Sequence, residues 1–298
     1  MQWTEEFRPS NLSEVIGQER TVQFFRNQAK AKPVTAWPHV IFFGLPGTGK
    51  TTMAEAIANE YDLQIIEINS SHYRRIEDME EIVMSAVKQV PEKGERKILF
   101  LDEADGLTPN SQWMLRRMME EYSNVTMFIL ACNNDAKIID AIYDRCLEFY
   151  FNVLTPEELK AVARNICSAE QRDVPPDSDL DALINASDGS ARSFTNLLYQ
   201  SIVGGVMPEI SFNVTEYIKA VKLNDLETAK KLTAKTTFRE LLREVLKALL
   251  RYGEKYEEPV RKLGDYFLLS PNPDENLGKI IVTLQLKKLL NGEKLGEK

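Results

Sequence analysis

A glycine-rich turn between an apolar run and a helical pattern constrains the fold of this chain more than any other feature. Residues 44–51 read GLPGTGKT, after the apolar run 40–43 and before an amphipathic pattern at 53–58. Glycines at 44, 47 and 49 let successive N–H groups turn toward one anion, and the following helix adds its positive end. The G-x-x-x-x-G-K-T pattern therefore predicts a nucleotide phosphate site, with a purely structural loop as the alternative. The predicted phosphate-binding residues are Pro46, Gly47, Thr48, Gly49, Lys50, Thr51 and Thr52.

Within this loop, two side chains have distinct expected roles. Lys50 would reach the β- and γ-phosphates, and the Thr51 hydroxyl would ligate Mg²⁺. Polar residues also end two later apolar runs: Asp102 and Glu103 follow residues 97–101, and Asn133 follows residues 125–132. In doubly wound sheets the carboxyl ends of the strands lie beside the phosphate loop. We therefore expect Asp102 to hold Mg²⁺ through water, Glu103 to polarise an attacking water and Asn133 to orient it. The alternative for the two acids is a polar strand end without a catalytic role.

The spacing of apolar residues predicts an α/β alternation followed by helices alone. Strands are expected at 39–43, 64–69, 97–101, 125–132 and 147–151, and helices at 19–31, 76–90 and 110–122. This order is typical of a sheet of four or five mostly parallel strands. At residues 155–158, Thr-Pro-Glu-Glu predicts a helix start with a Thr cap, Pro at its first position and Glu at its third. We predict three domains, at 1–153, 154–206 and 207–298.

Composition excludes several classes of protein. The net charge of −8 argues against a general nucleic-acid coat and leaves any such contact to a local basic line. Three cysteines without C-x-x-C spacing and two histidines argue against disulfide and zinc frameworks, which fits a reducing cytoplasm. The chain has no apolar run of transmembrane length and no signal-peptide pattern. We expect no membrane partner.

Residues 3–18 precede the first long helical pattern and allow two interpretations. Phe7 and Ile16 are apolar, and Arg8-Pro9 favours an extended link. The segment is either a strap packed on the core or a cover over the base of a bound nucleotide.

The order of phosphate loop, acids, asparagine and a later arginine resembles the AAA+ ATPases. More specifically, residues 3–198 resemble the small subunits of replication factor C and their archaeal and phage counterparts. The similar strings are WTEEFRPSNLSEVIGQE at 3–19, PHVIFFGLPGTGKT at 38–51, IEINSS at 66–71, LDEADGL at 101–107, LRRMME at 115–120 and DRC at 144–146. The resemblance implies an AAA+ parallel-sheet domain, a small helical lid and an all-helical collar that joins five subunits in a ring.

The resemblance also implies where a nucleotide would bind. ATP with Mg²⁺ would lie at subunit interfaces. Arg145 would be the arginine finger that reaches the neighbour's site, with an internal salt bridge as the alternative. Arg192 would contact the nucleotide in its own chain, with a free surface arginine as the alternative. Further nucleotide contacts are implied for Phe7, Arg8, Pro9, Ile16 and Gly17.

The implied function is that of a clamp-loader subunit. Such a ring opens a sliding clamp and loads it on primer–template DNA, and ATP hydrolysis, weak alone and stimulated by clamp and DNA, releases the closed clamp. The candidate DNA contacts are Arg74, Arg116 and Arg117, with Arg75 as a replacement for the family's basic residue at position 80; solvated surface arginines are the alternative. A clamp contact is expected in or beside 79–95, where an apolar patch of Met79, Val83, Val87, Val90 and Pro91 is not separable from core. The expected location is the cytoplasm at the replication fork, or the nucleus in a eukaryote.

Two alternative functions and three departures accompany this interpretation. A RuvB-type branch-migration motor shares the opening string, but its acids read D-E-I-H. The other alternative is a non-hydrolysing structural subunit that merely binds ATP, and the intact Lys50, Asp102 and Glu103 argue against it.

Leu45 replaces a family proline, and Glu80 stands where the family has a basic residue. Asp144 replaces the serine of the S-R-C signature and is expected to lie beside Arg145, available to pair with it.

Overall fold

A computed structural model describes residues 3–72, 76–207 and 214–234, together with residues 241, 245, 279, 282–284 and 286–288. The chain divides into two compact units, residues 1–208 and 209–298. The first unit contains both the α/β part and the helices that follow it. The finer division into three domains stays a prediction.

The first unit is built on a sheet of five parallel strands, as predicted. The strands are β1 (His39–Gly44), β2 (Ile65–Asn69), β3 (Lys97–Asp102), β4 (Thr126–Cys132) and β5 (Cys146–Phe151). Their order in the sheet is β2-β3-β4-β1-β5. Strands β1, β3 and β4 are buried almost throughout, because helices cover both faces of the sheet. The register pairs Phe43 with Cys132, so the phosphate loop and the residues after β4 begin at the same edge.

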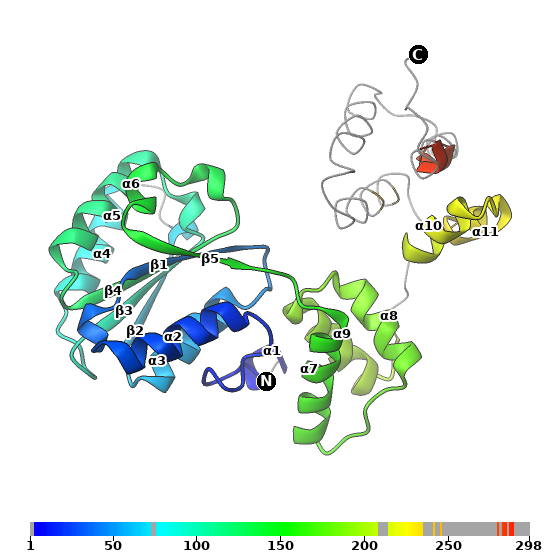
Figure 1. Cartoon of the computed structure of the whole chain (residues 1–298), viewed down its shortest axis with the longest axis horizontal. Coiled ribbons are helices and arrows are strands. Elements are labelled where there is room, and N and C mark those ends of the chain that lie inside the picture. The colour runs from blue at the N-terminus through cyan, green and yellow to red at the C-terminus, as the bar shows by residue number, and fades with distance from the viewer. Residues whose placement is uncertain are drawn as a thin grey trace, which may run out of the picture. The chain divides into compact units, whose positions relative to one another are not determined.

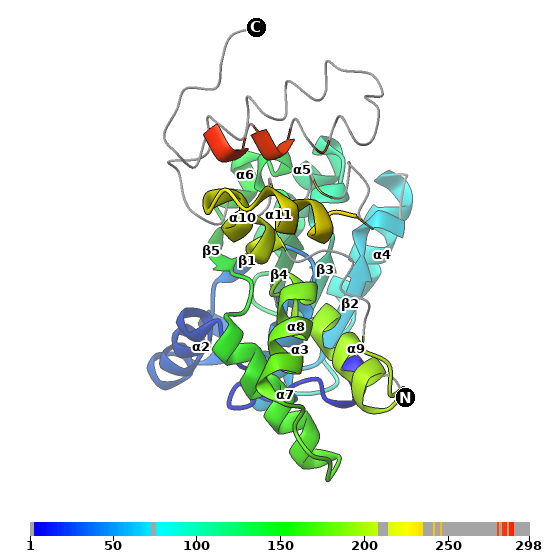
Figure 2. The same cartoon turned by 90° about the vertical axis from the view of Figure 1, so that its right-hand side faces the viewer.

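Helices cover the two faces of the sheet (Figure 1, Figure 2). Helices α2 (Glu19–Ala31) and α3 (Lys50–Glu60) lie on one face, and α4 (Ile76–Lys88), α5 (Pro109–Glu121) and α6 (Asp140–Tyr143) lie on the other. Successive side chains of a strand point to opposite faces. Accordingly, Val40 and Phe42 pack in the core beneath α2 and α3, whereas Ile41 and Phe43 pack beneath α4 and α5.

A helical lid follows β5 within the same unit. It consists of α7 (Pro156–Ala169), α8 (Asp177–Ser187) and α9 (Ala191–Ile202). The predicted capping box is confirmed: the Glu158 amide donates to Thr155 Oγ1 at 3.3 Å, and the Thr155 amide donates to Glu158 Oε2 at 2.7 Å. In the described residues after Phe151 there is no strand.

The segment before α2 contains a short helix, α1 (Trp3–Glu6), that the sequence analysis did not predict. Trp3 is 4% exposed and belongs to the core of the lid. Its ring meets the rings of Phe7 and Tyr199 edge to face, with centroids 5.7 and 5.1 Å apart. The N-terminal segment is therefore a strap that packs on two cores, through Trp3 on that of the lid and through Leu12 on that beneath α2 and α3.

The described part of the second unit is helical. It contains α10 (Val214–Lys222) and α11 (Leu226–Leu232), and Asp225 caps α11 by accepting a hydrogen bond from the Thr228 amide at 3.1 Å. The described residues between 241 and 288 are also helical, and the rest of the expected helical region at 212–290 lies outside the described residues. None of the helices in the described segments is both long and apolar enough to cross a membrane.

Candidate active site

A cavity of about 630 Å³ lies where the phosphate loop, the strand ends, the strap and the lid meet within the first unit. Its wall contains twelve of the predicted nucleotide residues, which come from three separate segments: Phe7, Arg8, Pro9, Ile16, Pro46, Gly47, Thr48, Gly49, Lys50, Thr51, Thr52 and Arg192. Asp102, Glu103 and Asn133 line the same cavity. This volume lies within the range of about 300–1,000 Å³ typical of small-molecule sites.

Lys50 is the central cation of the cavity. It is 7% exposed, and its Nζ donates to the carbonyl oxygens of Gly44 at 2.6 Å and Leu45 at 3.1 Å. The same Nζ donates to Asn133 Oδ1 at 2.9 Å, which connects the end of β1 with the end of β4. Burial lowers the pKa of Lys50, and the nearby carboxylate of Asp102 acts in the opposite direction.

The acids occupy the end of β3 as expected. Asp102 is paired with Asn69 in the sheet register, and its Oδ1 accepts a hydrogen bond from the Glu103 amide at 2.8 Å. Glu103 has φ = +52°, in the left-handed region that few non-glycine residues adopt. Asp105 Oδ1 accepts from the Asn133 amide at 3.2 Å and so couples the two strand ends. Such strained positions cluster at functional sites, in keeping with a catalytic role for Glu103.

The lid contacts the phosphate loop directly. The Ala191 amide, at the start of α9, donates to the Gly47 carbonyl at 3.1 Å. Gly47 has φ = +79°, and a Cβ there would meet the side chain of Ser190 and lie 3.4 Å from Arg192 Cβ. This close approach brings Arg192 to the wall of the cavity, beside the loop.

The strap forms another part of the cavity wall. Arg8 lines the cavity while its guanidinium donates to Glu55 Oε1 at 2.6 Å and to Glu5 Oε1 at 2.8 Å. Gly17 is not among the lining residues. It has φ = +75°, and a Cβ there would lie 2.7 Å from Leu154 Cδ2, so this glycine lets the strap pass close to the start of the lid.

Sequence reasoning missed several lining residues. Gln18 joins the loop to the end of β5, since its Nε2 donates to the carbonyls of Thr48 at 3.3 Å and Asn152 at 2.8 Å. Helix α7 contributes Val162, Asn165, Ile166 and Ala169. Their i, i+3, i+4, i+7 spacing marks one helix face, a signal that was present in the sequence but did not say what the face covers.

The cavity fits a nucleoside triphosphate with Mg²⁺. A buried lysine, the phosphate loop and the first residues of α3 line it, and a helix start supplies unpaired N–H groups suited to an anionic phosphate chain. Mg²⁺ keeps several waters and is bound through one or two protein groups together with substrate phosphates. Thr51 and Asp102 on the cavity wall are suitable donors of that kind. No group of three potential metal-ligating side chains occurs among the residues that the structure describes.

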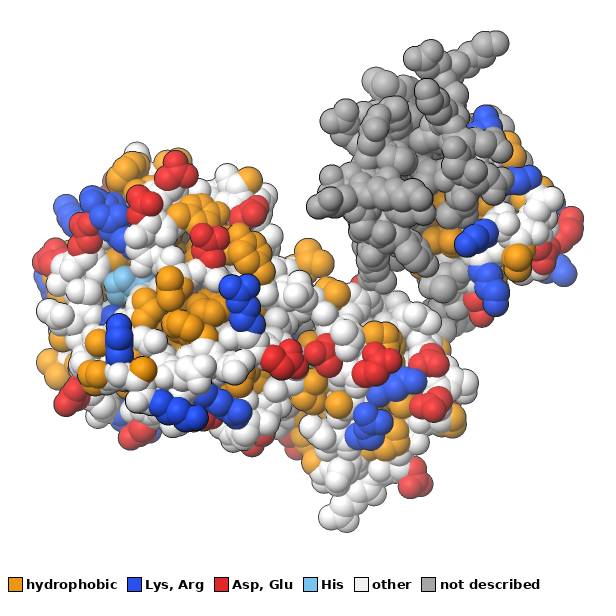
Figure 3. Space-filling model, viewed as in Figure 1, with side chains coloured by type: hydrophobic (Ala, Val, Ile, Leu, Met, Phe, Trp, Pro, Cys, Tyr) orange, Lys and Arg blue, Asp and Glu red, His pale blue; other side chains and the backbone are white. Residues whose placement is uncertain are grey.

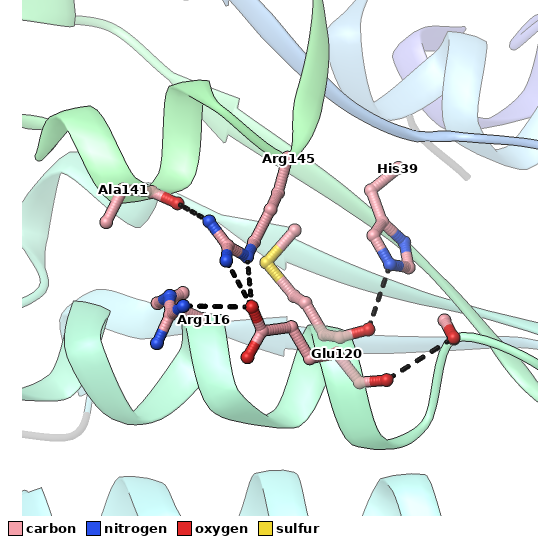
Figure 4. A network of polar contacts seen from close by, with 7 residues as sticks. His39, Arg116, Glu120, Ala141 and Arg145 are labelled. Atoms are coloured by element: carbon pink, nitrogen blue, oxygen red, sulfur yellow. Dashed lines mark hydrogen bonds and ion pairs between the residues drawn. The ribbon is translucent and has the colours of Figure 1, made fainter.

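Arg145 is not part of this cavity. Its Nε donates to Glu120 Oε1 at 2.9 Å, its Nη2 donates to the same oxygen, and its Nη1 donates to the Ala141 carbonyl at 3.1 Å (Figure 4). Arg145 thus makes an internal salt bridge, the alternative that the sequence left open, and its partner is Glu120 on α5 and not Asp144. Asp144 follows the end of α6 as its C-cap residue and is exposed. The hydrogen bond from Arg145 lowers the pKa of Glu120.

Of the four candidate DNA-contact arginines, two form ion pairs with acids and two lie outside the described residues. Arg116 pairs with Glu120 at 2.9 Å, and Arg117 pairs at 3.1 Å with Glu80, the acid that departs from the family pattern. On the face seen in Figure 3, basic side chains of the first unit are interspersed with acidic ones. Arg74 and Arg75 lie outside the described residues.

The apolar residues at 79–91, which the sequence did not separate from core, divide between the core and the surface. Met79, Val83 and Val87 are at most 1% exposed and belong to the core between α4 and the sheet. Val90, by contrast, is 79% exposed. The helical spacing of the patch residues was therefore that of a core face, and Val90 and Pro91 follow the helix end at Lys88.

Comparison with known proteins agrees with this site. The AAA family, "ATPase family associated with various cellular activities", matches residues 40–153. The replication factor C small subunit of Aeropyrum pernix is 34% identical over 270 residues, which cover 88% of this chain and 81% of that protein. The small subunit of Archaeoglobus fulgidus is 33% identical, with 91% and 86% covered. Replication factor C subunit 4 of Schizosaccharomyces pombe is 35% identical, with 76% and 68% covered.

Solved structures show the fold alone. The Thermotoga maritima RuvB Holliday junction branch migration motor aligns with a TM-score of 0.59 at 21% identity, covering 83% of this chain and 91% of that one. At that identity the likeness reflects a shared AAA architecture. The agreement with the curated relatives over most of their length and the AAA match over the phosphate loop lead to one conclusion: this chain belongs to the replication factor C small-subunit family and is an AAA-type ATP hydrolase.

Proposed function

We propose that this chain is an ATPase subunit of a DNA sliding-clamp loader. It binds ATP with Mg²⁺ in the cavity at the phosphate loop and works in a five-membered ring with other clamp-loader subunits. The ring opens a sliding clamp and places it on primer–template DNA, and hydrolysis releases the loaded clamp. The names of the relatives support this role, and the cavity supports the nucleotide chemistry.

One observation carries the proposal that the ring is the functional unit. The cavity gathers a lysine, two carboxylates, an asparagine and the lid arginine, whereas Arg145 lies outside it. The side chain of Arg145 is 24% exposed, and it is paired with Glu120 on helix α5 of the same chain. A cation presented in this way is suited to a phosphate on another subunit. An arginine finger of this kind contributes about 10³–10⁵ in rate in other phosphoryl-transfer enzymes.

The residues of this chain divide the chemistry among them. Lys50 exchanges its carbonyl partners for phosphate oxygens, and loop amides together with Arg192 hold the phosphate chain. Glu103 polarises the attacking water, and Asn133 orients it from the adjacent strand. Bound Mg²⁺ supplies positive charge at the phosphates, and Thr51 and Asp102 would hold it. Arg145 of the neighbouring copy or sister subunit stabilises the charge that develops on the γ-phosphate.

The test is ATP turnover in the reconstituted loader with clamp and primer–template DNA. Arg145→Ala should lower the stimulated turnover about 10³-fold or more while nucleotide binding stays intact. Lys50→Ala should remove nucleotide binding itself. Unaltered stimulated turnover in the Arg145 variant would contradict the trans assignment.

A second variant separates hydrolysis from binding. Glu103→Gln keeps the shape of the side chain but removes the carboxylate that polarises water. We expect ATP to remain bound with turnover lost, and clamp loading to halt before release. Turnover at the wild-type rate would indicate that another group activates the water. A junction-migration assay with four-way DNA serves as the control for a RuvB-type activity, and no migration is expected.

A further inference from the structure

One carboxylate oxygen holds two arginines at the end of α5. Glu120 Oε1 accepts from Arg116 Nη2 at 2.9 Å, from Arg145 Nε at 2.9 Å and from Arg145 Nη2 (Figure 4). The two guanidinium groups approach the same atom from different elements. Arg116 lies one turn earlier on α5, and Arg145 lies between α6 and β5. Without the carboxylate, the two positive charges would repel each other at this separation.

The contacts with Glu120 and Ala141 hold the guanidinium of Arg145 but do not use all of its N–H donors. A guanidinium has five N–H donors in a rigid planar fork. Glu120 takes the Nε–Nη2 edge, and the Ala141 carbonyl takes one N–H of Nη1, so that three of the donors are used among the described residues. Two N–H donors remain for an external anion. Hence the pairing with Glu120 does not exclude a phosphate contact.

A long arginine side chain loses rotamer freedom when it binds an anion. Holding the side chain beforehand removes that loss from the step in which the anion is bound, and it fixes the direction of the remaining donors. The hold on Arg145 comes from α5 on one side and from α6 on the other, because Glu120 and Ala141 belong to these two helices. Arg116 in turn steadies the carboxylate of Glu120.

We infer that Glu120 is a positioning residue for Arg145: its carboxylate holds the guanidinium so that the free donors face the neighbouring subunit's nucleotide. This inference rests on the proposed function, in which Arg145 acts in trans. It adds to that function a residue that touches neither ATP nor the reacting water. Its effect must therefore disappear when Arg145 is absent.

The experiment is a double-mutant cycle in the loader reconstituted with sister subunits, clamp and primer–template DNA. Glu120→Ala should lower the stimulated kcat about 10- to 100-fold, because a misplaced catalytic group has an effect of that size. The KM for ATP and the Kd of a fluorescent ATP analogue should stay at the wild-type values. Glu120→Gln, which keeps an acceptor oxygen but loses the charge, should fall between Glu120→Ala and the wild type.

Controls distinguish positioning from a structural role. Glu121→Gln changes the next exposed carboxylate of α5, which pairs with neither arginine, and should leave kcat unchanged. In the Arg145→Ala background, Glu120→Ala should lower neither the unstimulated turnover nor nucleotide affinity any further. A further loss there would overturn the positioning role in favour of a structural one. If Glu120→Ala prevents folding, the same double-mutant cycle is measured with Glu120→Gln in its place, and the stimulated kcat is compared with and without Arg145.

The outcomes also separate this inference from the proposed function. Wild-type kcat in both Glu120 variants, with Arg145→Ala inactive, would overturn the positioning role and leave the finger in place. Wild-type kcat in Arg145→Ala would overturn both. A loss of kcat confined to backgrounds that contain Arg145 supports both.

Discussion

At the scale of single residues, buried polar side chains join the elements around the sheet. His39, at the start of β1, accepts a hydrogen bond at Nδ1 from the Phe128 amide at 3.1 Å. Its Nε2 therefore carries the proton and donates to the Met119 carbonyl at 3.1 Å. Burial first, and the charge of Arg96 second, lower the pKa of His39 to about 4. The neutral imidazole thus links β4 with α5.

This histidine makes a pH dependence predictable. The unfolded pKa is near 6.5 and the folded pKa is about 4, so the folded state resists protonation. The stabilisation is fully present above pH 6.5 and is lost as pH falls toward 4, a change of about 3 kcal/mol in the free energy of unfolding. Urea titrations between pH 7 and 4 measure it. His39→Gln should flatten that slope, and an unchanged slope in this variant would assign it to other groups.

Arg96 is a second buried link, and it has no acidic partner among the residues that the structure describes. It is 2% exposed, and its guanidinium donates to the carbonyls of Val34, Trp37 and Thr126 at 2.6–3.1 Å. Burial lowers its pKa to about 10. Arg96→Ala should lower the free energy of unfolding by about 3 kcal/mol or more, because it leaves buried carbonyls without donors. Arg96→Lys keeps part of the bonding and should lose less; equal losses in urea unfolding would contradict this account.

At the scale of elements, local patterns predicted the parts of the site but not their contacts. The five strands follow from apolar periodicity, and the phosphate loop follows from the spacing of its glycines. The cap of α7 follows from Thr155 before Pro156, a pair typical of a helix start. By contrast, the sequence alone did not separate the apolar face of α4 from a surface patch. Nor did it predict that Trp3 packs in the lid or that Glu120, and not Asp144, pairs with Arg145. Such contacts depend on tertiary packing between segments far apart in the chain.

The contact between α9 and the phosphate loop yields an element-scale prediction. Gly47 leaves no room for a Cβ against Ser190, and its carbonyl accepts the Ala191 amide. Gly47→Ala should displace the start of α9, and Arg192 with it, and should strain a loop residue with positive φ. We expect ATP affinity to fall about tenfold or more, measured with a fluorescent analogue. Gly205→Ala is a suitable control: Gly205 also has positive φ, but a Cβ there would meet no atom within 4 Å. Equal affinity losses in the two variants would contradict the role of the lid contact.

At the scale of the whole molecule, the cavity and the proposed arginine finger belong to different places on one subunit. Lys50 lies in the cavity, and Arg145 lies outside it. In the proposed ring, each subunit would therefore carry one component for its own site and one for a neighbour's site. Loss of either component should inactivate an interface, but not the same interface.

This asymmetry can be tested by mixing two inactive variants of the chain in loaders that place copies of it side by side. Lys50→Ala subunits cannot bind ATP but carry an intact Arg145, and Arg145→Ala subunits have the reverse defect. With random mixing in equal amounts, about a quarter of the interfaces between copies combine an intact site with an intact finger. Stimulated ATP turnover should therefore reappear to about that extent, although each variant alone is inactive. A mixture as inactive as its components would show that Arg145 serves the site of its own chain, because only then does no combination of subunits restore a complete site.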